Sequence, residues 1–378
     1  MSHPALPGVT TAHRFPCTAC GADRRFDAGH DRLICDHCGQ TQTIAQPPPP
    51  GALSGGPSVL RELDFEAALA ASLPAQAFED LRVSHCPNCA AEVAFDAHIH
   101  AAECPFCATP VVTDTGPQRH IKPQGVLPFA LDENTARRAM TDWLGRLWFA
   151  PNGLQDYARK GRSLSGIYLP YWTFDADTRT RYSGARGTVY FETRKVLRKG
   201  RAAHQQIAKL RWSPVSGRVA RYFDDVLVRA SRALPAPHSE GLKPWDLAAL
   251  KPYRPDYLAG FRAEGYTVPL PDAYQAARAR MAEVIEQDIK HDIGGDRQRI
   301  HDIDTAISDV TFKHILLPVW LAAYKYRGQS YRCVVNGQTG RVQGERPYSP
   351  WKIAFALLLG LIIAGISGYL YGLEQGAF

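Results

Sequence analysis

Eight of the nine cysteines in this 378-residue chain occur in two sets with identical spacing. Each set has the form C-x2-C-x14-C-x2-C, and the second repeats the first 69 positions later. Two C-x2-C knuckles joined by a short hairpin direct four thiolates at one tetrahedral zinc ion. A unit of about 25 residues buries too little core to fold alone, so the metal supplies its folding free energy. We therefore predict two small β zinc ribbons, at residues 14–44 and 84–112, each with one structural Zn²⁺ ion. The predicted ligands are Cys17, Cys20, Cys35 and Cys38 in the first ribbon and Cys86, Cys89, Cys104 and Cys107 in the second.

Both sites are complete without water. Because all four positions are cysteine, no coordination position is open for a nucleophilic water, which argues against metal catalysis. Rubredoxin-like iron uses the same knuckle and stays an alternative to zinc. Thioredoxin-type redox chemistry is disfavoured, because its C-x2-C opens a helix in a βαβ unit and does not occur twice at ribbon spacing. Gly21 and Gly39 follow the knuckles of the first set, where a positive φ is often needed, whereas Ala90 and Ala108 take these places in the second.

The cysteines also indicate the redox compartment. Residues 1–16 contain no apolar stretch typical of a secretory signal. Metal thiolates in a reducing compartment therefore explain the cysteines better than disulfides do. The ninth cysteine, Cys333, alternates within a strand pattern, and we expect it to be a small core residue.

Residues 353–371 form an uncharged apolar run, IAFALLLGLIIAGISGYLY. A helix of this length spans about 28 Å, close to the hydrocarbon core of a bilayer. Aromatic residues flank the run, basic residues precede it and Glu374 follows it, so the positive-inside rule places the N-terminal bulk in the cytoplasm. We therefore predict a single-pass, tail-anchored membrane protein, with a buried core helix as the alternative. The flanking residues are Trp351, Tyr369 and Tyr371 (aromatic) and Arg341, Arg346 and Lys352 (basic).

Small residues recur every four positions within this run. They form a stripe on one helix face, of the kind that lets two membrane helices approach closely. We expect self-association or pairing with another membrane helix through the stripe, and a chance arrangement is the alternative. The residues are Ala356, Gly360, Ala364 and Gly368.

The remaining sequence divides by composition. Residues 45–63 are predicted to be a Pro/Gly linker, and residues 64–83 a helical connector broken at Pro74. Residues 120–349 are predicted to form an α+β domain with a mainly antiparallel sheet. Within it, apolar spacing predicts helices at 132–149 and 272–293, the second stopped by Gly294 and Gly295. Aromatic-rich stretches predict strands at 167–194 and 203–230, and the alternation of apolar and polar residues predicts strands within 311–345. The chain is thus predicted to be multidomain.

Positive charge concentrates in residues 179–232. This segment holds fourteen Lys and Arg against Glu192, Asp224 and Asp225, a net charge of +11 in a chain whose total is +7. Such a surface favours anionic lipid, nucleic acid or an acidic partner and does not choose among them. Residues suited to a nucleic-acid backbone and to base stacking are Arg194, Lys195, Arg198, Lys199, Arg201, Tyr190, Phe191 and Trp212.

No GxxxxGK[ST], HExxH, GxSxG or GxGxxG motif occurs, which disfavours a P-loop ATPase or helicase and several hydrolase classes. One stretch rich in Asp and His remains, between residues 288 and 304. Asp288, His291 and Asp292 share a helix face at i, i+3 and i+4, a spacing that could hold a divalent ion, and a solvated helix end is the alternative. A metal-dependent enzyme centred on His291 and His301 is therefore one hypothesis.

Several longer strings stand out in the sequence: LPYWTFDADT (169–178), RYFDDVLVRAS (221–231), YLAGFRAEGY (257–266), DIGGDRQRIHDID (292–304) and the stretch 312–349. With the ribbons and the final helix, they resemble a bacterial family of zinc-ribbon, tail-anchored membrane proteins. Members often carry the labels primosomal protein N′ or superfamily II helicase-like, and similar proteins occur beside SPFH-domain and phage-shock protein A relatives. The resemblance implies a membrane adaptor in envelope-stress or membrane-organising systems, at the bacterial cytoplasmic membrane.

Three functions follow from these features. The first is a non-enzymatic, membrane-anchored scaffold whose ribbons project on the linker to bind a partner protein, while the basic segment meets anionic lipid. The second is nucleic-acid binding through the ribbons and the basic segment. The third is the enzyme centred on the two histidines.

Overall fold

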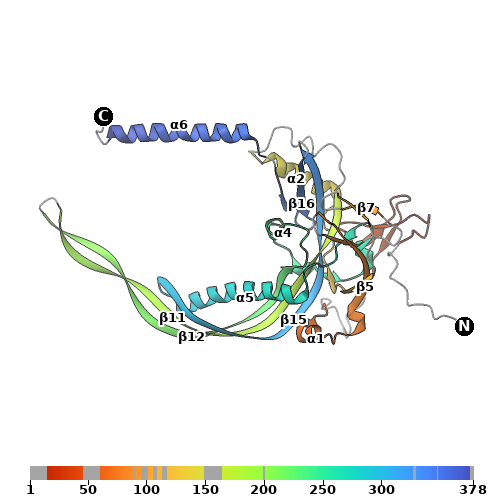
Figure 1. Cartoon of the computed structure of the whole chain (residues 1–378), viewed down its shortest axis with the longest axis horizontal. Coiled ribbons are helices and arrows are strands. Elements are labelled where there is room, and N and C mark those ends of the chain that lie inside the picture. Colours follow the sequence, from red (N-terminus) through yellow and green to blue (C-terminus); the bar gives the residue numbers. More distant parts are fainter. Residues whose placement is uncertain are drawn as a thin grey trace.

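Figure 1 shows the computed structural model of the chain, in which a long curved β arm and a separate helix project from a compact body. The fold is α+β with mainly antiparallel sheets, as the sequence predicts. The structure describes residues 15–45, 60–88, 91–94, 101–104, 109–112, 117–148, 164–198, 201–326, 329–346 and 348–374.

Three long strands build the central sheet and continue into the arm. They lie in the order β12-β11-β15, and β11 pairs antiparallel with both neighbours. Beyond β15, β10 pairs parallel with it, and β13 follows. Short strands β4, β14, β16 and β17 complete the sheet. The bounds are β4 (Leu63–Asp64), β10 (Gly125–Val126), β11 (Ser165–Arg198), β12 (Arg201–Arg229), β13 (Lys251–Pro252), β14 (Arg262–Ala263), β15 (Arg297–Tyr326), β16 (Gln329–Asn336) and β17 (Val342–Gly344).

The arm is one hairpin of β11 and β12 with β15 along part of its length. The β11–β12 ladder runs from Tyr171↔Arg229 to Arg198↔Arg201, which confirms the two predicted strands and extends them. β15 accompanies the hairpin only to Gly187↔Arg297, so the outer arm is a two-stranded ribbon. Register shifts interrupt both ladders near Asp175. Because bulges bend a strand and increase its twist, they account for the curvature visible in Figure 1.

Helix α5 (Leu270–Ile293) packs along one face of the arm (Figure 1). It confirms the predicted helix and ends at Gly294, whose φ of +63° is a conformation that glycine adopts without a Cβ penalty. Buried residues recur every three or four positions along the helix. They form a stripe that packs on the even-numbered side chains of β11, such as Ala176 and Tyr182. The buried helix residues are Leu270, Ala273, Ala277, Met281, Ile285, Ile289 and Ile293.

Helix α2 (Glu133–Gly145) begins at Asp132, whose carboxylate accepts a hydrogen bond from the Thr135 backbone at 2.9 Å. It is shorter than the predicted 132–149. Shorter helical segments lie between β12 and α5, namely α4 (Ala236–Gly241), η2 (Leu247–Ala249) and η3 (Pro255–Leu258).

Helix α6 (Pro350–Glu374) contains the predicted apolar run and lies clear of the body (Figure 1). Pro350–Gly368 has a mean hydropathy of 1.9 and no buried residue, so this helix is long and apolar enough to cross a membrane. The structure therefore does not support the alternative of a buried core helix.

The predicted connector and linker differ from the structure. Within 64–83, helix covers only α1 (Phe65–Leu69) and the single turn η1 (Ala75–Ala77), and β5 begins at Phe78. The helical prediction is wrong from that residue on, because β5 (Phe78–His85) finds a partner distant in sequence, β9 (Pro117–Ile121). The end of the predicted linker is also structured, since Leu63 pairs with Phe312 of β15. Residues 46–59 of that linker lie outside the described residues.

Candidate metal centre

Ribbon 1, the described residues 15–45, is a three-stranded antiparallel sheet carrying two cysteine knuckles. Its strands are β1 (Arg25–Phe26), β2 (Arg32–Ile34) and β3 (Thr41–Thr43). Gly21 and Gly39 have φ values of +76° and +74°, as the sequence predicts. Each glycine donates its backbone N–H to the carbonyl of the first cysteine of its knuckle, Cys17 or Cys35, which closes the turn.

The four thiols of ribbon 1 converge. The Sγ atoms of Cys17, Cys20, Cys35 and Cys38 all lie within 4.8 Å of one another. Cys17 and Cys38 are 3.6 Å apart, and Cys20 and Cys35 are 3.5 Å apart. Tetrahedral zinc with Zn–S bonds of about 2.3 Å separates its sulfurs by about 3.8 Å, so the arrangement fits a Zn²⁺ ion with little movement.

Backbone amides around the knuckles favour thiolates. The amide of Ala19, aided by that of Cys20, lowers the pKa of the Cys17 thiol to about 6. At Cys20 the amide of Ala22 acts in the same direction, but partial desolvation and the neighbouring thiols of Cys35, Cys38 and Cys17 outweigh it and raise the pKa to about 12. Four adjacent thiols cannot all ionise unless a cation compensates their charge, which is the role a divalent metal would fill.

The second cysteine set repeats the backbone of the first where the structure describes it. In ribbon 1 the amides of Cys17 and Cys35 each donate to the carbonyl five residues later. The amides of Cys86 and Cys104 do the same, at 2.9 and 2.8 Å. Both of these cysteines are buried, next to the strands β6 (Glu92–Ala94), β7 (Ala101–Glu103) and β8 (Pro110–Val112). The other two predicted ligands, Cys89 and Cys107, lie outside the described residues.

Ribbon 1 does not project on a linker but packs into the body. Phe26 and Leu33 are each 1% exposed and belong to the same core cluster as residues of the central sheet. The Phe26 ring meets Tyr257 edge-on at 5.3 Å, and the Phe26 amide donates to the Ala259 carbonyl. The apolar side of the ribbon is therefore fixed, and its cysteine end faces outward, because Cys20 and Cys38 are exposed.

The stretch 288–304 does not assemble a site. Asp288 binds the Arg221 guanidinium through both oxygens, at 2.6 and 2.7 Å, and Asp292 accepts a hydrogen bond from the Tyr182 hydroxyl at 2.5 Å. His291 and His301 are exposed. Within the described residues, neither histidine belongs to a group of three ligands close enough to share an ion. The geometry of the described residues therefore gives no support to a divalent site on this helix face and agrees better with the alternative of a solvated helix end.

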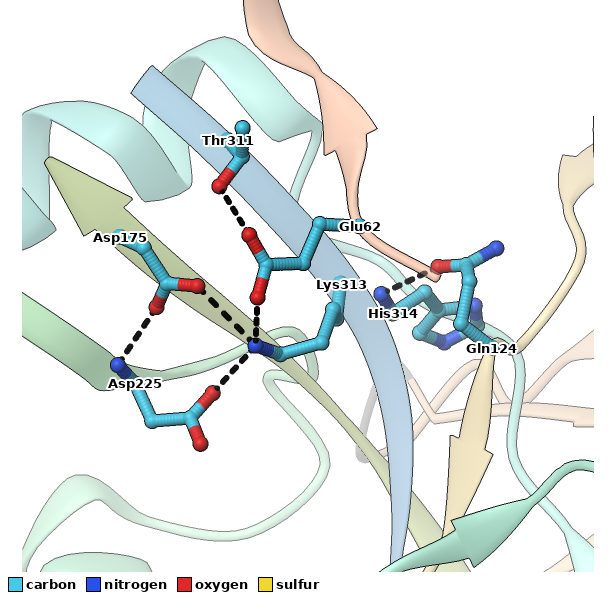
Figure 2. A network of polar contacts seen from close by, with 7 residues as sticks. All are labelled: Glu62, Gln124, Asp175, Asp225, Thr311, Lys313 and His314. Carbon is cyan, nitrogen blue, oxygen red and sulfur yellow. Dashed lines mark hydrogen bonds and ion pairs between the residues drawn. The ribbon is translucent and has the colours of Figure 1, made fainter. Parts of the chain in front are cut away.

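The structure instead reveals a buried ionic network around Lys313 that sequence reasoning missed (Figure 2). The Lys313 ammonium contacts the carboxylates of Glu62, Asp175 and Asp225 at 2.9, 3.1 and 2.9 Å. The Lys313 and Asp175 side chains are only 6% and 2% exposed. No spacing signal links these residues, because tertiary folding joins four segments distant in sequence.

The carboxylates of this network differ in proton affinity. Burial raises the pKa of Asp175 to about 6. At Glu62 burial acts in the same direction, but hydrogen bonds with Asp175, Thr311 and Lys313 outweigh it and lower the pKa to about 2. Asp175, Asp224 and Asp225 are close enough to share a cation, but the Lys313 ammonium already contacts two of them. We therefore interpret the network as a structural ion cluster that joins the segment before β4 to the sheet.

Cys333 is fully buried in the core, as predicted, and burial raises the pKa of its thiol to about 12. A buried thiol of this kind is chemically inert at neutral pH.

Comparison with known proteins gives one informative similarity. The chain is 26% identical over 238 residues to the uncharacterized protein YdjG of Bacillus subtilis strain 168, covering 62% of this chain and 67% of that protein. No family model matches the chain. No solved structure matches it. The similarity relates the chain to a bacterial protein and brings no activity with it.

Proposed function

We propose that the chain is a non-enzymatic, zinc-binding adaptor that α6 anchors in a membrane. The observation that carries the proposal is the four-thiol site of ribbon 1. Four thiolates complete the coordination of zinc and leave no position for a reacting water, so such a site stabilises a fold and does not perform hydrolysis. The repeated backbone bonds at Cys86 and Cys104 support a second structural zinc ion in ribbon 2, residues 84–112.

The outward end of ribbon 1 is the partner surface in this proposal. The tips of the two knuckles carry Thr18 and His37, which are exposed, whereas Phe26 and Leu33 at the opposite side are buried in the body. A rigid, metal-stabilised tip held on the body presents a fixed surface to another protein. With α6 in the bacterial cytoplasmic membrane, this surface would face the cytoplasm, in keeping with reduced cysteines. An envelope-stress or membrane-organising system fits this arrangement.

The test uses the full chain extracted with its native lipid. Zinc is measured by elemental analysis, and everything that co-purifies is quantified by mass spectrometry. The tip variant Thr18→Glu with His37→Glu is compared with Gln275→Glu with Ala276→Glu, an equal charge change at exposed positions of α5. A stoichiometric protein lost only from the tip variant supports the adaptor. If the tip variant co-purifies with the same proteins as the unaltered chain, the adaptor proposal is contradicted.

Nucleic-acid binding is the second candidate, because the exposed basic arm is an observation in its favour. Arg194 and Arg211 are exposed on the outer arm. This reading requires DNA or RNA affinity that falls steeply with salt and is abolished when the basic side chains of the arm are neutralised. Nuclease-sensitive material in the extraction above, with no partner protein, would favour it over the adaptor. The enzyme centred on His291 and His301 has no comparable geometric support.

A further inference from the structure

We propose that the outer arm, residues 186–194 of β11 with 204–213 of β12, is a lipid-binding ribbon that inserts its apolar face shallowly into an anionic bilayer. The proposal rests on the membrane attachment through α6 and adds the lipid class and the residues that meet it. Figure 1 shows this part of the arm well beyond the body.

The outer face of this ribbon, opposite α5, is apolar and exposed. Residues directly opposite in an antiparallel ladder share a face. Val189 pairs with Leu210, and Phe191 pairs with Ala208, on the odd-numbered face of β11 that points away from the helix. Phe191 is 65% exposed and Leu210 is 41% exposed. An exposed apolar strip of this kind marks an interaction surface.

Two basic side chains flank the strip on its own face. On the same face, β15 places Arg299 opposite Ala185 and Arg297 opposite Gly187, and both arginines are exposed. The described basic residues of the hairpin itself, Arg186, Arg194, Lys209 and Arg211, belong to its other, even-numbered face. By sequence, residues 186–213 as a whole carry a net charge of +7. Apolar side chains at the acyl boundary with basic ones at the phosphates are the arrangement of interfacial membrane-binding segments. The charge therefore selects an anionic surface.

The aromatic contacts favour lipid over nucleic acid. Base stacking needs an open ring face. The Arg299 guanidinium lies 4.1 Å from the Trp212 ring centroid, and the Arg211 guanidinium lies 5.0 Å from that of Tyr190. One face of each ring is thus occupied by a cation. Phe191 keeps an exposed ring, but Leu210 beside it is aliphatic, so this part of the strip can enter hydrocarbon and cannot stack on a base.

The arm can reach the bilayer that α6 crosses. The arm and α6 project from the same side of the body in Figure 1. None of Pro350–Gly368 is buried, so side-chain packing does not fix the direction of this helix relative to the arm. With α6 across the bilayer, the outer arm, residues 186–194 with 204–213, can meet its surface with the outer face down, while the part of the arm nearer the body stays off it.

The test places the photo-crosslinking residue p-benzoylphenylalanine at position 191 of the full chain, reconstituted in vesicles of phosphatidylcholine with or without phosphatidylglycerol. Position 222 is the matched control, because Tyr222 is an exposed aromatic residue (59%) on the same face but nearer the body. We expect lipid adducts at 191 in anionic vesicles, few at 191 in neutral vesicles, and few at 222 in both. Arg297→Gln with Arg299→Gln should lower the yield at 191 by roughly 25-fold, since each basic residue changes partitioning by about fivefold.

Flotation of the same samples separates the two proposals. A chain that floats with both vesicles but gives equal adducts at 191 and 222, or no dependence on anionic lipid, overturns the role of the arm alone. A chain that floats with neither overturns both the anchor and the arm. Added oligonucleotide that replaces lipid in the adducts at 191 also overturns the lipid assignment.

Discussion

Replacing Lys313 with methionine tests the buried network and predicts a pH-dependent loss of stability. The substitution keeps the apolar stem and removes the ammonium that contacts Glu62, Asp175 and Asp225. Breaking a buried ion pair from one side leaves unpaired charge and costs about 3–5 kcal/mol. We expect this loss in the free energy of unfolding at pH 7.5.

The pH dependence follows from Asp175. In the folded protein its pKa is raised to about 6, whereas the unfolded chain releases this proton near pH 4. The folded state therefore binds more protons between these values, and this group lowers stability by about 3 kcal/mol as the pH rises through the window. In Lys313→Met the buried carboxylates lose their cation, which favours their protonated form. Folding of the variant should therefore bind at least one more proton near neutral pH than folding of the wild type does. As the pH falls, the stability loss in the variant should then decrease by about 1.4 kcal/mol per pH unit. At pH 6.0 the loss should be about 2 kcal/mol smaller than at pH 7.5.

Urea unfolding in detergent, followed by tryptophan fluorescence, measures both effects, and Trp172 is a buried reporter on β11 beside His314. The control is Lys290→Met, which breaks an i, i+4 pair with Glu286 whose side chains are 38% and 47% exposed. It should lose no more than about 1 kcal/mol at either pH. A loss below 1 kcal/mol for Lys313→Met, or an equal loss at both pH values, would refute the reasoning.

Three further outcomes are expected. Cys35→Ser should remove one zinc ion per chain by elemental analysis, whereas Cys333→Ala should retain the zinc content of the wild type, and equal zinc in both variants would exclude the ribbon 1 site. Phe26→Ala should lower the free energy of unfolding in urea by about 3–5 kcal/mol, because Phe26 is 1% exposed in the contact between ribbon 1 and the body. An unchanged urea midpoint would mean that ribbon 1 is not packed there. Gly360→Leu with Ala364→Leu should reduce self-association in detergent, measured by light scattering, because the added side chains would hold two helices apart at the stripe. A Cβ at Gly360 meets nothing within 4 Å in the chain itself, so the change should not disturb the fold, and an unchanged oligomeric state would leave the stripe without that role.

Local signals in the sequence were sufficient for several features. The spacing of Cys17, Cys20, Cys35 and Cys38 predicted a site whose thiols the structure brings together, because each knuckle is closed by backbone bonds within a few residues. Helical periodicity and Gly294 predicted α5, and the uncharged run predicted α6. In each case the determining interactions lie within one element or one turn.

Only the tertiary structure decided the features that join distant segments. Spacing could not reveal that Phe26 docks ribbon 1 into the body, that β5 pairs with β9, or that Lys313 meets three carboxylates from separate segments. Spacing also could not show that Asp288 accepts hydrogen bonds from Arg221 and that Asp292 accepts one from Tyr182, so that the two carboxylates do not share an ion. The physical reason is the same throughout: a cysteine knuckle or an apolar helix is fixed by neighbours in sequence, whereas strand partners and buried ion pairs are fixed by which surfaces must be removed from water together.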